Sequence, residues 1–208
     1  VIGALIGDSH ANAISTELGR DAKKAGFGLF QLTFNGCPSV QGVYRVDMAA
    51  DDKCYEFNEK SYTYLKNNDA IQYVVIASFW TRYLKTSAFS NGEGTNILHT
   101  FDLLDSVENG VRERNQEKIR VEKLKKKYIE SILSLLNTGK KVILVYPVPE
   151  TGWRTPDFLV KQKMFHAADI KRSTSYALFK ERNKDAIEAL DAIGEHDNLI
   201  RVYPDKIL

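Results

Sequence analysis

The chain has 208 residues, of which 43% are hydrophobic, 27% charged and 11% aromatic. This balance is that of one ordinary globular domain or two small ones, and it excludes a collagen, a coiled coil and a disordered tail. The 29 basic and 27 acidic residues leave a formal net charge of +2, which is too small to indicate a nucleic-acid partner.

Apolar runs of strand length alternate with stretches of helical periodicity along the whole chain. In chain order, we expect a strand at residues 1–6, a helix at 11–25, a strand at 29–34, a helix at 54–66, a strand at 71–77, a helix at 111–137, a strand at 140–145, a helix at 175–193 and a strand at 199–202. In the first helix, the apolar positions 13, 14, 18, 22 and 25 lie on one helical face. The most β-branched run, residues 71–77, is expected to be the central strand.

Strands that alternate with helices predict a mostly parallel sheet of about five strands with helices on both faces. We therefore expect an α/β three-layer sandwich, with residues 1–208 in a single domain. The longest strongly apolar run has eight residues, from Tyr73 to Trp80, whereas a membrane-spanning helix needs about 20. No basic region or small-residue cleavage site precedes the first strand, so we expect any targeting signal to lie outside these residues.

Two polar segments are candidates for a functional role. Residues 87–110 are polar and weakly periodic, which predicts either a functional lid or a poorly ordered loop. The four lysines at positions 123 and 125–127 lie on an expected helix that also carries glutamates at helical spacing. That pattern predicts a solvated, ion-paired face and not a binding patch.

The strongest local signal for chemistry is the sequence Gly7-Asp8-Ser9-His10, between the first strand and the first helix. Ligands of open parallel sheets bind outside the carboxyl ends of the strands, which is where Ser9 lies. Free amides at a helix N-terminus favour an oxyanion, so Ser9 is suited to be a nucleophile whose own amide is an oxyanion donor. Alternatively, Asp8 or Ser9 is only the N-cap of the helix, worth about 1 kcal/mol. His10 follows on the first turn and points away from Ser9, which favours a binding or structural role.

Cys37 and Cys54 are the only cysteines. They have neither a second pair to complete a zinc site nor the spacing of a redox motif. Two alternatives stay open on the residues alone. The cysteines are either two buried thiols or one disulfide, which would stabilise the chain by roughly 3 kcal/mol and indicate an oxidising compartment.

Four blocks at the ends of successive expected strands resemble those of one enzyme family. The blocks are residues 7–11 (GDSHA), 35–38 (NGCP), 74–83 (VVIASFWTRY) and 145–152 (VYPVPETG). Together they resemble the SGNH (GDSL-like) hydrolases, and the first block is closest to one branch. That branch is the SGNH domain fused behind the membrane acyltransferase family 3 domain in bacterial envelope O-acyltransferases. The resemblance covers essentially the whole chain and implies the flavodoxin-like SGNH fold.

The resemblance implies roles for individual residues. Ser9 matches the catalytic nucleophile, and the backbone amides of Ser9 and Gly36 match two oxyanion donors. A glycine at position 36 also makes physical sense, because a residue without a Cβ lets the acyl oxygen approach the backbone. The family's third block supplies an asparagine as a further donor, and this chain has none there. The candidates to line the site are Asp8, His10, Trp80 and Arg82.

The general base is the largest departure from the family. Its members carry an Asp, two intervening residues and a His near the carboxyl end, but no Asp of this chain has a His three positions on. The other histidines, His99, His166 and His196, do not occur in that context. We therefore expect the base beyond Leu208 and residues 1–208 to lack the last block. A degenerate domain that binds without catalysing is the alternative.

The branch resemblance implies that Cys37 and Cys54 form a disulfide. It also implies a periplasmic domain of an inner-membrane enzyme that passes an acetyl or short acyl group, through an ester of Ser9, to a carbohydrate such as O-antigen or another envelope polysaccharide. The acyl donor would be relayed from an N-terminal membrane domain. No cofactor, metal or nucleic acid is implied, and the isolated domain is expected to be monomeric.

Two other functions stay open. One is a stand-alone carbohydrate or lipid esterase of the same fold. The other is a non-catalytic carbohydrate-binding module, in which Trp80, Tyr83 and Trp153 would be the sugar platforms.

Overall fold

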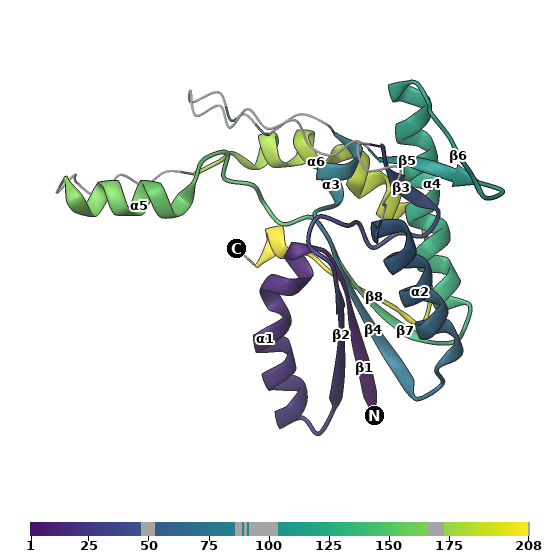
Figure 1. Ribbon diagram of the computed structural model, residues 1–208. Helices are drawn as coiled ribbons and strands as arrows, with labels where there is room; N and C mark the ends of the chain where they lie inside the picture. The colour runs from purple at the N-terminus through teal and green to yellow at the C-terminus, as the bar shows by residue number, and fades with distance from the viewer. Residues whose placement is uncertain (47–52, 86–88, 90, 92–103, 166–172, 208) are drawn as a thin grey trace.

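The computed structural model describes residues 1–46, 53–85, 89, 91, 104–165 and 173–207. Its centre is a five-stranded sheet in which all neighbouring strands are parallel (Figure 1). The strands, in spatial order, are β2 (Gly28–Thr33), β1 (Ile2–Gly7), β4 (Ile71–Ala77), β7 (Lys141–Val145) and β8 (Leu199–Val202). The prediction that the β-branched run 71–77 is the central strand is confirmed, because β4 lies third of five.

Helices cover both faces of this sheet, as predicted from the alternation of elements. Helix α1 (Ser9–Lys24) packs on β1, β2 and β4 from one side. On the other side lie α2 (Lys53–Asn67), α4 (Glu117–Leu136) and α6 (Tyr176–Asp191), whose apolar residues share one core with the strands. The predicted α/β sandwich is therefore confirmed. No helix among the described residues is long and apolar enough to cross a membrane.

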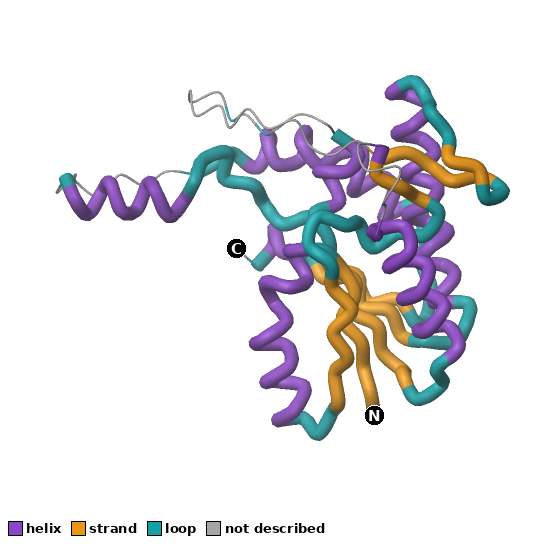
Figure 2. Tube along the Cα trace, viewed as in Figure 1, coloured by secondary structure: helices purple, strands orange, loops and turns teal. Residues whose placement is uncertain are grey.

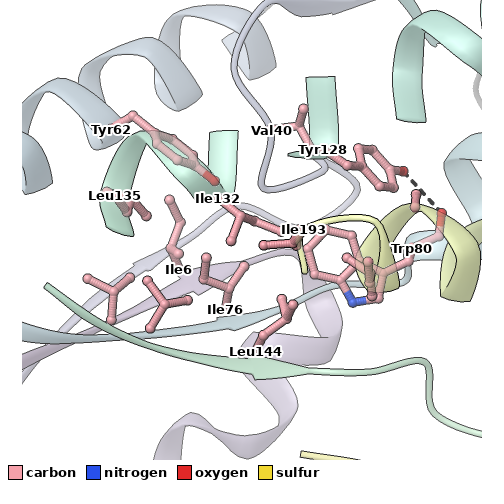
Figure 3. Packing of buried hydrophobic residues seen from close by; sticks show 14 of the residues in the cluster. Ile6, Val40, Tyr62, Ile76, Trp80, Tyr128, Ile132, Leu135, Leu144 and Ile193 are labelled. Carbon is pink, nitrogen blue, oxygen red and sulfur yellow. Dashed lines mark hydrogen bonds between the residues drawn. The ribbon is translucent and has the colours of Figure 1, made fainter. Parts of the chain in front are cut away.

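The larger core lies between the sheet and α2, α4 and α6. Alternate strand residues such as Ile6, Ile76 and Leu144 point into it, as the two-residue period of a strand requires (Figure 3). Trp80 and Tyr128 meet edge to face above them, with ring centroids 5.2 Å apart, and the Tyr128 hydroxyl donates to the Trp80 carbonyl at 3.1 Å. This core fixes the carboxyl end of β4, where the third sequence block lies.

The opposite core, under α1, is much smaller. It contains Leu5, Ala11, Val75 and Ala77, and Ala11 is the one buried residue of α1. The predicted apolar face of α1 is only partly buried: Leu18 packs against this core, whereas Ile14 is 39% exposed.

A second, antiparallel sheet lies apart from the first and was not predicted (Figure 2). It consists of β3 (Val43–Arg45), β5 (Leu104–Glu108) and β6 (Val111–Arg112). Asn109 and Gly110 connect β5 to β6 with φ of 50° and 77°, the positive values of a two-residue hairpin turn. The predicted helix at 111–137 therefore begins only at Glu117. Within residues 87–110, for which a lid or a poorly ordered loop was predicted, Leu104–Glu108 form a strand, and most of 87–103 lies outside the described residues.

Two short helices were also missed, α3 (Trp80–Leu84) and α5 (Thr155–Met164). The lysine run on α4 is ion-paired as predicted, but it is not a fully solvated face, because the side chains of Lys125 and Lys127 are only 15% and 14% exposed. Lys123 bridges Glu113, Lys125 lies 3.1 Å from Asp185, and Lys127 lies 3.3 Å from Glu108.

Gly7 provides a test of how β1, β4 and α1 meet. A Cβ at this position would lie 2.0 Å from the Ala77 carbonyl oxygen and 2.3 Å from the Ala11 Cβ, so Gly7→Ala should lower the free energy of unfolding by about 3 kcal/mol or more. In α1, Gly19 has open space around it, and Gly19→Ala should raise that free energy by about 0.5–1 kcal/mol. Urea unfolding followed by circular dichroism measures both. Equal effects of the two substitutions would contradict the packing described.

Candidate active site at the carboxyl edge of the sheet

Ser9 lies where the chain leaves β1 and enters α1. It is the first residue of α1 and is exposed, while Gly7 and Asp8 before it are buried. Within the described chain no residue hydrogen-bonds its hydroxyl. The backbone amides of the first turn of a helix have no partner in the helix, so a free hydroxyl and an electropositive helix end occur together here.

Asp8 holds this turn in place through four hydrogen bonds. Its Oδ1 accepts from the His10 amide at 2.8 Å, so Asp8 is the N-cap of α1. Its Oδ2 accepts from the Ser78 hydroxyl at 2.9 Å, the Phe79 amide at 2.8 Å and the Tyr83 hydroxyl at 2.8 Å. The capping alternative raised from the sequence is thus correct for Asp8, and it leaves the Ser9 hydroxyl free. Asp8 lines no surface, because it is fully buried.

His10 points toward the β4–α3 turn. Its ring stacks on that of Phe79, with centroids 4.6 Å apart and planes at 16°. Burial lowers the pKa of His10 below its ordinary value of 6.5, the charges of Asp8 and Glu150 act in the opposite direction, and the charge of Arg82 lowers it further. His10 is therefore a neutral, stacked side chain near neutral pH.

Gly36 lies in a tight turn just after β2, the strand that pairs with β1. The Phe34 amide donates to the Gly7 carbonyl at 3.0 Å, which joins the ends of β1 and β2. The Cys37 amide then donates to the Phe34 carbonyl at 3.0 Å, and Gly36 has a φ of +79°. These are the features of a type II turn, whose third residue must tolerate a positive φ. The positive φ of this turn position favours a glycine.

A disulfide closes this turn against α2. Cys37 and Cys54 are bonded, with Cα atoms 5.3 Å apart, which confirms the pairing implied by the family resemblance. Two further contacts fix the same junction, since the Asn58 amide donates to the Pro38 carbonyl at 2.6 Å and the Tyr62 hydroxyl to the Ser39 carbonyl at 2.8 Å. The Gly36 turn is thereby attached to the first half of α2.

The β4–α3 turn lacks the family's asparagine, as the sequence shows, and two of its own donors are already engaged. The Ser78 hydroxyl and the Phe79 amide both donate to Asp8. Trp80, proposed to line the site, is fully buried, and its indole N–H donates to the Val145 carbonyl at 2.9 Å. That expectation is corrected, because the carbonyl at the end of β7 takes up the only polar group of Trp80.

The proposed sugar platforms are corrected in the same way. Trp80, Tyr83 and Trp153 have exposed fractions of 0%, 1% and 9%, so their faces are covered by protein. The aromatic side chain that stacks on His10, the residue after Ser9, is instead Phe79, which no sequence signal singled out.

Charged residues behind His10 were also missed from the sequence. Glu150, in the segment after β7, accepts from the Arg182 Nε of α6 at 2.9 Å, and both side chains are largely buried. The charges of Arg82 and Glu150 both affect the pKa of His10, so Arg82, a predicted site residue, also lies near His10. Glu150 lies in the fourth sequence block, but its partner Arg182 is 32 residues further along the chain, so the block did not predict the ion pair.

A histidine base for Ser9 is not present among the described residues. His196 precedes β8 and its Nδ1 accepts from the Asn198 amide at 3.0 Å, which places it at the amino edge of the parallel sheet, away from Ser9. His99 and His166 lie outside the described residues. Within the described ranges, no group of three or more potential metal-binding side chains lies together.

Comparison with known proteins is consistent with this arrangement. The model of the family described as "SGNH domain (fused to AT3 domains)" matches residues 2–208. The chain belongs to this SGNH family. No curated protein sequence matches it significantly.

A solved structure shares the fold of this SGNH domain. It is the periplasmic domain of a lipopolysaccharide acetyltransferase from Salmonella ser. Paratyphi A, with a TM-score of 0.57 and 14% sequence identity. The match covers 97% of this chain and 65% of that one, so the chain spans less than two thirds of that domain's length. At this identity the likeness concerns the fold.

Removing one donor to Asp8 tests the network of the SGNH domain. In Tyr83→Phe, a buried carboxylate loses a hydrogen bond, and the free energy of unfolding should fall by about 1.5–3 kcal/mol. Burial and the charge of Asp8 raise the pKa of Tyr83 well above its ordinary value, so the hydroxyl donates throughout the accessible pH range. Tyr64→Phe, on the exposed side of α2, should change the unfolding free energy by less than about 0.5 kcal/mol. A Tyr83→Phe protein as stable as the wild type would refute the role of this bond.

The lowered pKa of His10 predicts a pH dependence of stability. As pH falls below 6.5, the unfolded chain takes up a proton at His10 while the folded chain does not, so the folded state loses stability down to the folded pKa. In His10→Gln this contribution is absent, and the unfolding free energy should depend less steeply on pH between about 7 and 5. Urea unfolding of both proteins across that range measures the difference. A wild-type curve no steeper than that of the variant would contradict burial of a neutral His10.

Proposed function

We propose that this SGNH domain is a serine-dependent acyltransferase that esterifies a carbohydrate hydroxyl in the periplasm. The single observation that carries the proposal is the exposed Ser9 hydroxyl on a turn fixed by a buried carboxylate, beside the glycine turn at Gly36. Family membership and the fold of the Salmonella acetyltransferase domain support an enzyme of this class. The acceptor would be a sugar of an envelope polysaccharide.

The reaction proceeds in two steps. The Ser9 Oγ attacks the carbonyl carbon of the donor, its proton passes to a base, and the donor's leaving group departs to give an acyl ester on Ser9. A sugar hydroxyl then attacks the same carbonyl carbon and passes its proton to the base. The bond to the Ser9 Oγ breaks as the acylated sugar forms, and the base returns a proton to Ser9. In each step the amides of Ser9 and Gly36 would hold the oxyanion of the tetrahedral intermediate.

The base is proposed to come from residues that follow Leu208 in a longer chain, in the Asp-x-x-His arrangement of the family. Support comes from the direction of β8, which is parallel to β1 and ends at the same edge of the sheet as Ser9. Figure 1 shows the C-terminus at the end of the sheet where α1 begins. A segment continuing from there could reach Ser9 without crossing the sheet.

The acyl donor is proposed to be relayed by an N-terminal membrane domain of the kind named in the family description. No cofactor takes part in the proposed chemistry. A stand-alone esterase of the same fold differs only in using water as the second nucleophile. A binding module is the weaker alternative, because its proposed platforms Trp80, Tyr83 and Trp153 are buried.

A serine-directed fluorophosphonate tests the nucleophile in the full-length protein. It should add one mass, located on Ser9, and Ser9→Ala should abolish the labelling. Ser15→Ala, on the same helix, is the matched control and should label normally, because the Ser15 hydroxyl donates to the Asn12 carbonyl. No label at Ser9 would refute the enzyme and favour the binding module.

Transfer is tested with an acetyl ester donor and an oligosaccharide acceptor. The proposed function predicts an acetylated sugar that depends on Ser9. Hydrolysis of the ester with no acetylated sugar would refute transfer and favour the esterase.

A further inference from the structure

The second half of helix α5 exposes apolar side chains. Leu159, Val160 and Met164 are 55%, 56% and 67% exposed, and Phe165, directly after the helix, is 74% exposed. None of the ten residues of α5 is buried. Figure 1 shows the helix projecting away from the sheet and from the other labelled helices. Exposed apolar side chains gathered on one projecting element are typical of a docking surface.

The same helix carries an excess of positive charge. Between positions 154 and 165, three basic residues and one acidic residue leave a net charge of +2, equal to that of the whole chain. Arg154 lies 3.3 Å from Asp157, so the unbalanced charge belongs to Lys161 and Lys163 in the last turn. Any partner of α5 therefore has to accept apolar and cationic groups together.

The spacing of these residues favours a lipid surface over a protein groove. Val160 and Met164 are four residues apart, as are Leu159 and Lys163, so these four share one side of the helix. A protein groove that buried this side would have to bury the Lys163 ammonium as well. At a bilayer surface, a lysine stem lies along the apolar boundary while its ammonium reaches lipid phosphates.

We propose that α5 and Phe165 form a docking surface for an anionic lipid bilayer. The apolar side chains enter the boundary between headgroups and acyl chains, and Lys161 and Lys163 contact anionic headgroups. The chain reaches α5 from the carboxyl end of β7, the edge of the sheet at which Ser9 lies. Docking through α5 would thus hold that edge close to the membrane surface, and it does not require Ser9 to be catalytic.

Vesicle co-sedimentation tests the proposal directly. The protein should bind vesicles of phosphatidylglycerol and phosphatidylcholine at low salt, bind pure phosphatidylcholine vesicles less, and lose affinity as salt is added. Lys161→Glu with Lys163→Glu should lower the partition coefficient on the mixed vesicles by about tenfold or more. Leu159→Ser with Met164→Ser should lower it by about tenfold, because both apolar anchors are lost.

Matched variants elsewhere on the surface separate α5 from general effects. Lys118→Glu with Lys126→Glu changes the net charge by the same amount on exposed positions of α4. Val111→Ser with Ile119→Ser removes two exposed apolar residues far from α5 in the sequence. Both control proteins should bind vesicles within about twofold of the wild type. Ser9→Ala should bind unchanged, so the result is independent of the proposed reaction.

Three results would overturn the proposal. One is equal binding to anionic and pure phosphatidylcholine vesicles, or none to either. A second is wild-type binding by both α5 variants. The third is a loss of self-association in the α5 variants, seen by sedimentation velocity without vesicles, which would assign the surface to a second copy of the chain.

Discussion

The geometry of the site depends on one buried carboxylate. Asp8 accepts hydrogen bonds from the first turn of α1 and from the β4–α3 turn, so it connects the carboxyl ends of two adjacent strands. No described side chain forms an ion pair with it, and its charge is offset by four donors and by the N-terminal end of α1. A buried charge satisfied by hydrogen bonds alone tolerates little displacement of its donors. Ser9, the next residue, is held at a defined height above the sheet for this reason.

This arrangement has a cost for oxyanion binding. The groups that the β4–α3 turn could offer to an acyl oxygen, the Ser78 hydroxyl and the Phe79 amide, are already committed to Asp8. The proposed oxyanion site therefore rests on the backbone amides of Ser9 and Gly36. One missing donor costs roughly 3 kcal/mol of transition-state stabilisation when nothing replaces it. If these amides act as proposed, the rigidity contributed by Asp8 and the disulfide would make them more effective, because preorganised dipoles need not be reoriented during the reaction.

Sequence patterns predicted the parts of this structure that depend on local periodicity. The five parallel strands, the central position of β4 and the place of Ser9 follow from apolar runs and from the order of the elements. Features that depend on contacts between distant residues did not follow. Nothing in the sequence indicates that the Trp80 indole meets the Val145 carbonyl, or that Arg182 pairs with Glu150. The hairpin at Asn109–Gly110 was missed despite a recognisable signal, because the flanking strands are short and the helical pattern after them dominated.

A parallel sheet explains why so many functional features gather at one edge. All five strands end on the same side, so the turns after β1, β2, β4 and β7 supply Ser9, Gly36, Phe79 and Glu150 without long connections. The same geometry sends the chain from β7 toward α5 and brings the end of β8 to the level of Ser9. A base added after β8 and a membrane contact made by α5 would therefore act on one edge from two sides. At the opposite edge, the His196 Nδ1 accepts a hydrogen bond from the Asn198 amide within its own turn, and the segments there only connect helices to strands.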